Sequence, residues 1–147
     1  LDGLYRERGV KLEIAPVAPE LAAWADPAHL GRALRNVMTN AAQHTPSGKT
    51  VRVSATPAGE AGDRVQIRVI DQGPGIPAED LPHIFERFYR SDPARAPQPT
   101  MSTGAGPRAG IGLTIARELL APSGGVISVE HTGSDGSTLL LELAAHP

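Results

Sequence analysis

The segment DPAHLGRALRNVMTNAAQH, residues 26–44, predicts a long amphipathic helix around which the rest of the chain is organised. Asp26 is a typical N-cap residue, because its side-chain oxygen can accept hydrogen bonds from the free amides at a helix start. Pro27 follows at the first helical position, where its missing N–H loses no hydrogen bond. Apolar residues then recur every three or four positions, which places them on one stripe that we expect to be core. They are Leu30, Ala33, Leu34, Val37, Met38 and Ala41.

Amide side chains border this apolar stripe. At about 100° of rotation per residue, Asn36, Asn40 and Gln43 fall along one edge, with His29 on the same flank. Two asparagines one turn apart lower helix propensity, because their short side chains compete for backbone hydrogen bonds. An amide oxygen is a hard, uncharged ligand that suits Mg2+ held mainly by water and phosphate. The edge therefore indicates a metal-phosphate site, and the alternative is a pair of solvated or core-bonded asparagines.

The composition is that of one ordinary domain. The chain has 147 residues, enough for a hydrophobic core, and it has no cysteine for a disulfide framework or a thiolate metal site. Its 14 basic and 16 acidic residues give a net charge of -2, which argues against nucleic acid or a membrane surface as a partner. Neither an apolar run of about 18 residues nor a signal-peptide core is present, so we expect a soluble fragment.

Alternating and periodic apolar residues predict the remaining elements. Strands are expected at residues 10–14, 51–55, 64–70, 126–130 and 138–143. A short helix is expected to start at Pro77, and a longer one to open at Gly110 and end before Pro122. Residues 91–109 contain almost no large apolar side chain, so we expect a mobile loop there. The order predicts an α/β two-layer sandwich: a mixed, mostly antiparallel sheet of about five strands covered on one face by about three helices.

Two glycine-bearing turns carry the other candidate chemistry. Asp71 follows the third predicted strand and precedes Gly73 and Gly75, which permit positive φ or close backbone approach. A turn aspartate that bonds only its own loop is the alternative. Gly110 and Gly112 open the last predicted helix, where exposed amides and the helix dipole would favour an anion.

Four sequence blocks in this order resemble the catalytic ATP-binding domain of sensor histidine kinases. The blocks are NVMTNAAQHTP (36–46), DQGPGIP (71–77), FERFYR (85–90) and GIGL (110–113), and the match covers nearly the whole chain. That domain has the Bergerat fold, shared with the gyrase B subunit, an ATP-driven cytosolic chaperone and mismatch-repair ATPases. The resemblance implies that residues 1–147 form one such domain, with a flexible ATP lid at about residues 91–109.

The resemblance implies a common cavity for ATP and Mg2+. Asp71 is expected to accept a hydrogen bond from the exocyclic amine of adenine, with Gly73 and Gly75 letting the backbone pass close to the base. Asn40 is expected to be the protein ligand of Mg2+, with Asn36 assisting one turn earlier. The other expected nucleotide contacts are Gln43, His44, Ile76, Phe88, Arg108, Gly110, Ile111, Gly112, Leu113 and Ser137.

The phenylalanine block adds candidate catalytic cations. Phe85 and Phe88 resemble the aromatic residues that seat the lid. Arg87 or Arg90 is expected to reach the terminal phosphate, as charge-assisted donors do in phosphoryl transfer. A solvated helix face is the alternative for both arginines.

The chain departs from the family pattern at two places. Gln43 stands where the family often has Lys or Arg, so one phosphate-directed charge is missing and a reduced nucleotide affinity is expected. Pro107 and Arg108 stand where the second glycine block commonly has paired glycines. We therefore expect a lid that is stiffer at its root, with Arg108 supplying charge from a new direction.

The resemblance also bears on the activity. ATP-hydrolysing relatives place a glutamate one turn before the magnesium-binding asparagine, and this chain has Asn36 there, which cannot take a proton at neutral pH. A kinase is thus favoured over an ATPase. The acceptor histidine is expected on a separate upstream dimerisation domain that also meets a response regulator. The full-length protein is expected to be a homodimer, with this domain as the cytoplasmic part of a membrane-anchored kinase. A degenerate regulatory module, a related ATPase and an anti-sigma serine kinase are the alternatives.

Overall fold

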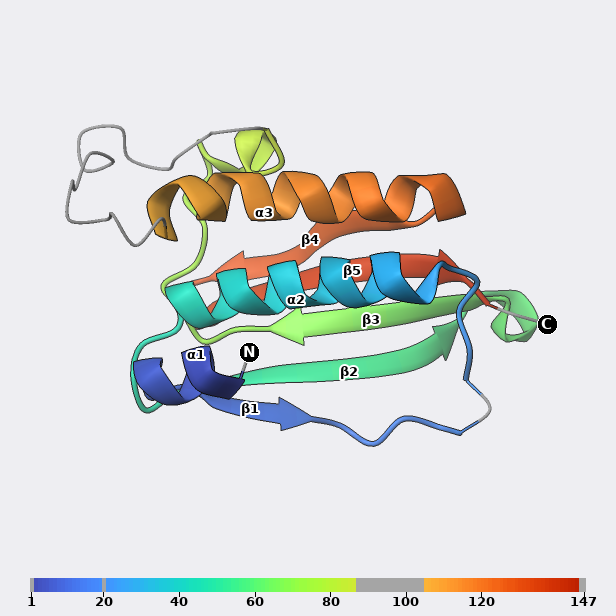
Figure 1. Cartoon of the computed structure of the whole chain (residues 1–147), viewed down its shortest axis with the longest axis horizontal. Coiled ribbons are helices and arrows are strands. Elements are labelled where there is room, and N and C mark those ends of the chain that lie inside the picture. The colour runs from blue at the N-terminus through green and yellow to red at the C-terminus, as the bar shows by residue number, and fades with distance from the viewer. Residues whose placement is uncertain (1, 20, 87–104, 146–147) are drawn as a thin grey trace.

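The structure, a computed structural model, describes residues 2–19, 21–86 and 105–145, with the backbone alone for Asp2 and residues 105–112. It has two layers (Figure 1). Three α-helices, α1 (Asp2–Arg8), α2 (Pro27–His44) and α3 (Ala105–Leu120), cover one face of a five-stranded sheet in this described part. The predicted α/β sandwich is confirmed. None of the described helices combines the length and the apolar character needed to cross a membrane.

The sheet is mixed and mostly antiparallel, as predicted. Its strands are β1 (Lys11–Ile14), β2 (Thr50–Ala58), β3 (Arg64–Ile70), β4 (Val126–Gly133) and β5 (Gly136–Ala144). They lie in the order β1-β2-β3-β5-β4, with β1 parallel to β2 and the other pairs antiparallel. Ile70 pairs with Thr138, so the loop that follows β3 lies beside the start of β5.

Helix α2 forms as its sequence predicts. The Asp26 carboxylate accepts hydrogen bonds from the amides of Ala28 (2.8 Å) and His29 (3.2 Å). Both bonds lower the pKa of Asp26 below its ordinary value, and the bond from His29 has the larger effect. The predicted stripe lies in the core, with Ala33, Val37, Met38 and Ala41 buried and Leu30 and Leu34 packed against it.

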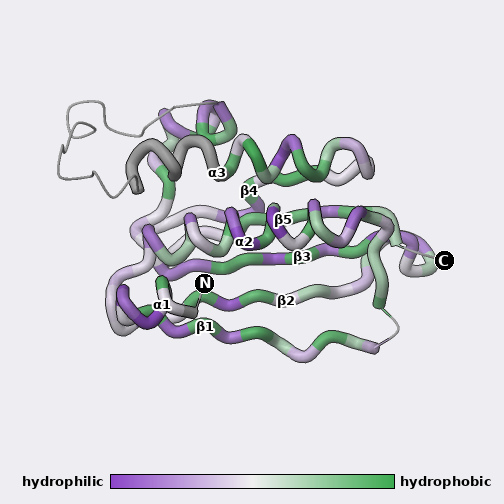
Figure 2. Tube along the Cα trace, viewed as in Figure 1, coloured by the Kyte–Doolittle hydropathy of each residue, from purple (hydrophilic) through white to green (hydrophobic). Residues whose placement is uncertain are grey.

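The two faces of the sheet differ because polar and apolar residues alternate along its strands (Figure 2). On β3 the side chains of Val65, Ile67 and Val69 are buried toward the helices, as predicted. Between them Arg68 points to the other face, where its guanidinium holds both carboxylate oxygens of Glu130 at 2.7 and 2.8 Å. Charged side chains such as these remain in contact with water, so the helices pack on the apolar face only.

The N-terminal part departs from the sequence prediction. Helix α1 was not predicted. Ile14, expected to be half-buried, is 64% exposed, whereas Val10 is buried. The physical reason is that β1 is an edge strand, which has a neighbour on one side only.

Strands β2, β4 and β5 are longer than predicted, because the β2–β3 and β4–β5 pairings continue to the ends of their hairpins. The loop between β2 and β3 is shorter in consequence than the gap between the predicted strands 51–55 and 64–70. Pro57 and Ala58 still pair with β3, and the turn contains a single 3-10 turn, η1 (Glu60–Gly62).

The prediction of a short α-helix that starts at Pro77 is wrong. Only a 3-10 turn, η2 (Leu81–His83), forms in this segment as far as residue 86. Pro82 within it lacks the N–H that would continue a helix. Ile84 and Phe85 still pack against the core, as expected.

Helix α3 begins earlier than predicted, at Ala105 instead of Gly110. Pro107 lies in its first turn, where a missing N–H loses no intrahelical bond. Residues 105–109 are therefore helical and not loop, while the rest of the predicted lid lies outside the described residues. The predicted end is confirmed: α3 stops at Leu120, a 3-10 turn η4 (Ala121–Ser123) follows, and Gly124 adopts a left-handed φ of 74°.

Candidate functional site

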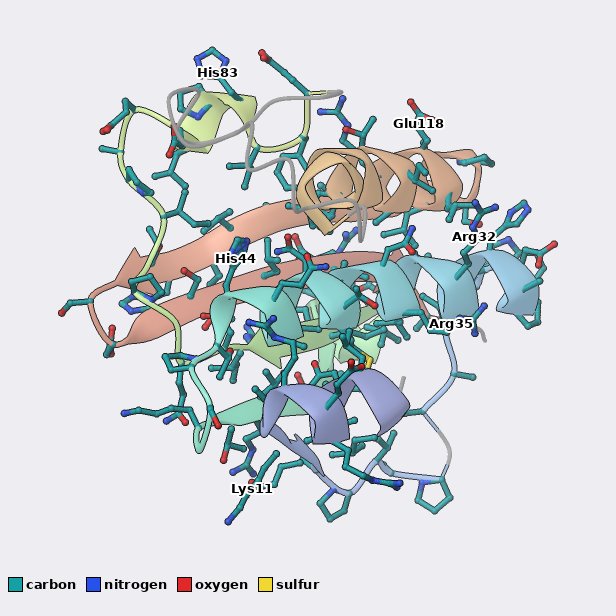
Figure 3. The ribbon with its side chains drawn as sticks, turned by 60° about the vertical axis from the view of Figure 1, so that its left-hand side comes forward. Lys11, Arg32, Arg35, His44, His83 and Glu118 are labelled. Carbon is teal, nitrogen blue, oxygen red and sulfur yellow. The ribbon has the colours of Figure 1, made fainter. Side chains whose placement is uncertain are left out.

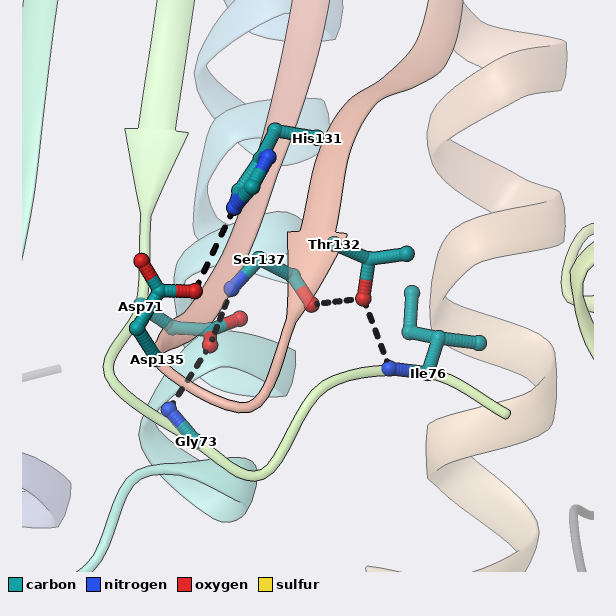
Figure 4. Close-up of polar contacts among 7 residues, drawn as sticks. All are labelled: Asp71, Gly73, Ile76, His131, Thr132, Asp135 and Ser137. Atoms are coloured by element: carbon teal, nitrogen blue, oxygen red, sulfur yellow. Dashed lines mark hydrogen bonds and ion pairs between the residues drawn. The ribbon is translucent and has the colours of Figure 1, made fainter. Parts of the chain in front are cut away.

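Asp71 lies immediately after β3 and is 6% exposed. Its Oδ1 accepts hydrogen bonds from the amides of Gly73 (2.9 Å) and Ser137 (3.0 Å), as Figure 4 shows. Its own amide donates to the carbonyl oxygen of Ser137 at 2.8 Å. Oδ2 accepts no hydrogen bond from the described residues. Among the described residues, the loop and β5 therefore bond only one of the two carboxylate oxygens.

The sequence left two interpretations open for Asp71, a turn aspartate and an acceptor for the adenine amine. The structure shows the turn bond and leaves the adenine contact a prediction. The bond from Gly73 is the turn interaction of an ordinary loop aspartate. The bond from Ser137, 66 residues away, holds the carboxylate in one orientation against β5. Because a carboxylate only accepts hydrogen bonds, the remaining oxygen is suited to a donor such as an exocyclic amine.

The glycines of this loop allow close backbone contacts. A Cβ on Gly73 would collide with the carbonyl oxygen of His44 at the end of α2, and one on Gly75, whose φ is 91°, with that of Gly133. Gly73 thus packs the loop on α2, and Gly75 packs it on the β4–β5 hairpin. The predicted close approach is confirmed for the chain's own backbone, and the approach to a base stays a prediction.

A hydroxyl pair links the loop to the hairpin. The amide of Ile76 donates to Thr132 Oγ1 (2.7 Å), which lies 2.8 Å from Ser137 Oγ (Figure 4). Ser137 is 4% exposed. Sequence reasoning missed Thr132, although a two-residue turn at Ser134-Asp135 would have paired it with Ser137, as the observed register does.

The amide edge of α2 has few bonds of its own. Asn40 is 8% exposed, Asn36 and Gln43 are half-buried, and the Asn40 side chain makes no hydrogen bond to another described residue. The described residues contain no group of three or more His, Cys, Asp or Glu side chains that could hold a metal. An ion such as Mg2+, held by one amide oxygen, phosphate and water, fits these residues.

His44 projects from the C-terminal end of α2 (Figure 3). Its ring keeps an exposed edge, yet desolvation by the surrounding protein lowers its pKa below the ordinary value. The Asp71 carboxylate opposes this change, and the Arg8 guanidinium adds to it. The lowered pKa favours the neutral imidazole over the charged form.

The glycines of α3 do not lie where the sequence placed them. Because α3 begins at Ala105, Gly110 and Gly112 are its sixth and eighth residues, and the prediction that they expose the first helix amides is wrong. Leu113 is a buried core residue. The nucleotide contacts expected of all three stay predictions.

Several predicted site residues cannot be placed. Arg87, Phe88 and Arg90 lie outside the described residues, as do the side chains of Arg108 and Ile111. Their roles stay predictions, and so does the common cavity between Asp71 and the asparagines. A shallow pocket of about 340 Å³ is formed elsewhere, at the N-terminal end of α2, and none of the predicted site residues lines it.

Phe85 lies between η2 and helix α3. Thr114 Oγ1 on α3 donates to the Phe85 carbonyl oxygen (2.7 Å), and the Arg117 guanidinium lies 5.7 Å from the centre of the Phe85 ring. Both contacts tie α3 to the segment that follows the Asp71 loop. The expectation that Phe85 seats the lid stays a prediction, because residues 87–104 lie outside the described part of the chain.

The chain is similar to known proteins over most of its length. Residues 25–147 match the family described as histidine kinase-, DNA gyrase B- and HSP90-like ATPase. The sensor protein SphS of Synechococcus elongatus is 37% identical over 123 residues, which are 83% of this chain and 29% of SphS. The chain thus spans under a third of the length of this curated relative.

Solved structures are similar over nearly the whole chain. The mycobacterial sensor histidine kinase MprB superposes with a TM-score of 0.75 and 28% identity, over 99% of this chain and 89% of that one. Full-length ShkA in complex with AMPPNP gives a TM-score of 0.75 and 28% identity, over 98% of this chain and 28% of ShkA.

Proposed function

The chain belongs to the family of histidine kinase-, DNA gyrase B- and HSP90-like ATPases, and we propose that it is the ATP-binding catalytic domain of a sensor histidine kinase. In this proposal the domain binds Mg-ATP and presents the terminal phosphate to a histidine on a separate dimerisation domain. That domain then passes the phosphoryl group to a response regulator. The full-length protein is a homodimer with this domain on the cytoplasmic side of a membrane.

The single observation that carries the proposal is the state of the Asp71 carboxylate. Two backbone amides hold Oδ1, and Oδ2 accepts no bond from the described residues. An adenine amine can donate to that oxygen. Guanine presents a carbonyl oxygen at the same position of the ring, and two acceptors repel each other. The site therefore favours ATP over GTP by a rule of hydrogen-bond complementarity.

At the phosphate end, Asn40 would hold Mg2+ through its amide oxygen, with Asn36 one turn earlier. The ion supplies neutralising charge to the phosphate oxygens during transfer. Asn36 cannot act as a general base, so bound ATP is not efficiently attacked by water and is kept for another acceptor. This difference separates a kinase from the ATP-hydrolysing members of the family.

The transfer itself needs an acceptor from outside this chain. The bond between the terminal phosphorus and its bridging oxygen breaks, an N–P bond to the acceptor imidazole forms, and ADP leaves. The acceptor's ring proton passes to a base of the partner domain. The residues of this chain contribute positioning and electrostatic stabilisation, with Arg87 or Arg90 as the proposed cation near the terminal phosphate.

Titration with a fluorescent ATP analogue and Mg2+ tests the binding step. Saturable binding that Asp71→Asn weakens is expected, whereas no saturable binding, or binding that Asp71→Asn leaves unchanged, contradicts the proposal. A supplied dimerisation domain then tests the transfer. Acid-labile, base-stable phosphorylation of its histidine supports a histidine kinase and excludes a serine kinase. Binding without any transfer favours the regulatory module, for which Gln43 is the supporting feature.

A further inference from the structure

Helix α1 lies beside the C-terminal half of α2 and contacts it (Figures 1 and 3). Tyr5 is its buried anchor, 3% exposed, and the hydroxyl donates to the carbonyl oxygen of Met38 at 2.6 Å. Burial, with a smaller contribution from the Asp71 carboxylate, raises the pKa of Tyr5 to about 12. The hydroxyl therefore keeps its proton, and the donated bond, at all ordinary pH values.

Arg8, at the other end of α1, caps α2. Its Nε donates to the carbonyl oxygen of Ala42 (2.9 Å) and its Nη2 to that of Gln43 (3.0 Å). These are two of the last four carbonyl groups of α2, which have no partner within the helix. The positive guanidinium also lies at the negative end of the helix dipole, where a cation is stabilising.

The turn that α1 holds is the one that carries the candidate site. Asn40 lies between the bonded carbonyls of Met38 and Ala42, and His44 follows Gln43. The His44 carbonyl in turn is the surface on which Gly73 packs the Asp71 loop. Because a hydrogen-bonded helical turn moves as a unit, displacing its carbonyls would displace both the Asn40 amide and the loop.

We propose that Tyr5 and Arg8 are positioning residues of the nucleotide site, because they hold the last two turns of α2, which carry Asn40 and on which Gly73 packs the Asp71 loop. Neither side chain touches the nucleotide. A movement of α1 then changes nucleotide affinity through α2 alone. Any interaction that shifts α1 would therefore change the affinity of the site. This inference rests on the proposed nucleotide-binding function.

Matched variants of α1 test the inference. Arg8→Ala removes the cap, Arg8→Lys keeps the charge but not the two-pronged contact, and Tyr5→Phe removes a single hydroxyl. Arg6→Ala is the control, since Arg6 is an exposed residue of the same helix with no side-chain bond to another described residue. Titration with a fluorescent ATP analogue and Mg2+ should show about fivefold weaker binding for Arg8→Ala, an intermediate loss for Arg8→Lys and Tyr5→Phe, and none for Arg6→Ala.

Two readouts separate positioning from general loss of stability. Amide hydrogen exchange should speed up in residues 38–45 of Arg8→Ala while β3 and β5 stay protected. The pKa of His44, followed by NMR, should rise because the Arg8 charge that lowers it is gone. Faster exchange spread evenly over the whole chain, unchanged binding in a folded Arg8→Ala variant, or an equal loss in Arg6→Ala would overturn the inference.

The same readouts keep the inference apart from the proposed function. If the unaltered chain binds no nucleotide, the proposed function fails. Amide hydrogen exchange in residues 38–45 and the change in the pKa of His44 then still decide whether α1 positions the last turns of α2.

Discussion

Around Asp71 the polar atoms bond one another, whereas along the amide edge of α2 the side chain of Asn40 has no bond to another described residue. The first region joins β3, the loop after it and the β4–β5 hairpin through Asp71, Ser137, Thr132 and the amides of Gly73 and Ile76. The second is one flank of a single helix. The Asp71 region is thus held in shape by its own hydrogen bonds. The Asn40 side chain has no such support from the described residues.

This difference separates stability from binding. Removing a partner from a buried, bonded network leaves other groups unsatisfied, which costs about 1–3 kcal/mol for each group. Removing an unbonded amide leaves nothing unsatisfied. Substitutions that remove a bond near Asp71 should therefore lower stability as well as ligand affinity, and substitutions at Asn40 should affect ligand affinity alone.

The largest expected effect comes from Asp71→Asn, which changes the central residue of the bonded region. The amide oxygen can keep the bonds from Gly73 and Ser137, but an NH2 group replaces Oδ2 and meets the adenine amine donor to donor. We expect affinity for a fluorescent ATP analogue to fall about a hundredfold, roughly 2.7 kcal/mol. Thermal unfolding should change little. As a matched comparison, Asp71→Ala should also lower the free energy of unfolding by about 2–4 kcal/mol, because two buried amides lose their acceptor.

Asn40→Ala tests the amide edge of α2, where we expect an effect on affinity and little effect on stability. Affinity for the nucleotide with Mg2+ should fall about tenfold, and the free energy of unfolding in urea should change by less than about 1 kcal/mol. The loss should disappear when Mg2+ is left out of the titration, because the amide acts through the ion. A variant as unstable as Asp71→Ala would show that Asn40 belongs to a bonded network after all.

Thr132→Val tests the hydroxyl pair that links the loop to the hairpin. Valine has nearly the same shape but no acceptor, so the Ile76 amide and the Ser137 hydroxyl both lose a partner. Because both bonds are only partly buried, water can replace part of each, and we expect the free energy of unfolding to fall by about 1 kcal/mol in total. Thr132→Ser should restore most of it, and Thr56→Val on the exposed part of β2 should have no such effect. Equal stability of the two Thr132 variants would contradict the assigned bonds.

The smallest expected effect is a pH dependence from His44, which lies where the two regions meet. Its pKa in the folded chain is below the unfolded value of 6.5, so the unfolded chain binds more protons in the interval between the two values. The contribution of His44 to stability is complete above pH 6.5 and is lost as the pH falls through the folded pKa. Between pH 7.5 and 5 the unaltered chain should therefore lose more stability in urea than His44→Gln. A larger loss in His44→Gln would reverse the sign and contradict this assignment.

The sequence was a good guide wherever the structure depends on neighbouring residues. The cap at Asp26, the buried stripe of α2 and the bounds of β3 follow from local hydrogen bonding and periodicity. It was a poor guide to α1, because a helix of seven residues with Tyr5 as its buried residue has no periodic pattern to detect. It also placed the start of α3 too late, since the glycines suggested a loop where Ala105 begins the helix and Pro107 lies in its first turn.

The identity of the candidate site residues could likewise be predicted, because Asp71, Asn40 and their glycines form short motifs. Which of their atoms stay available to a ligand could not. That depends on contacts between distant segments: Ser137 with Asp71, 66 positions apart, and Tyr5 with Met38, 33 positions apart. Local preferences choose helices, strands and turns over a few residues. The fixed orientation of the Asp71 carboxylate and the capped end of α2 exist only once the folded chain brings distant segments together.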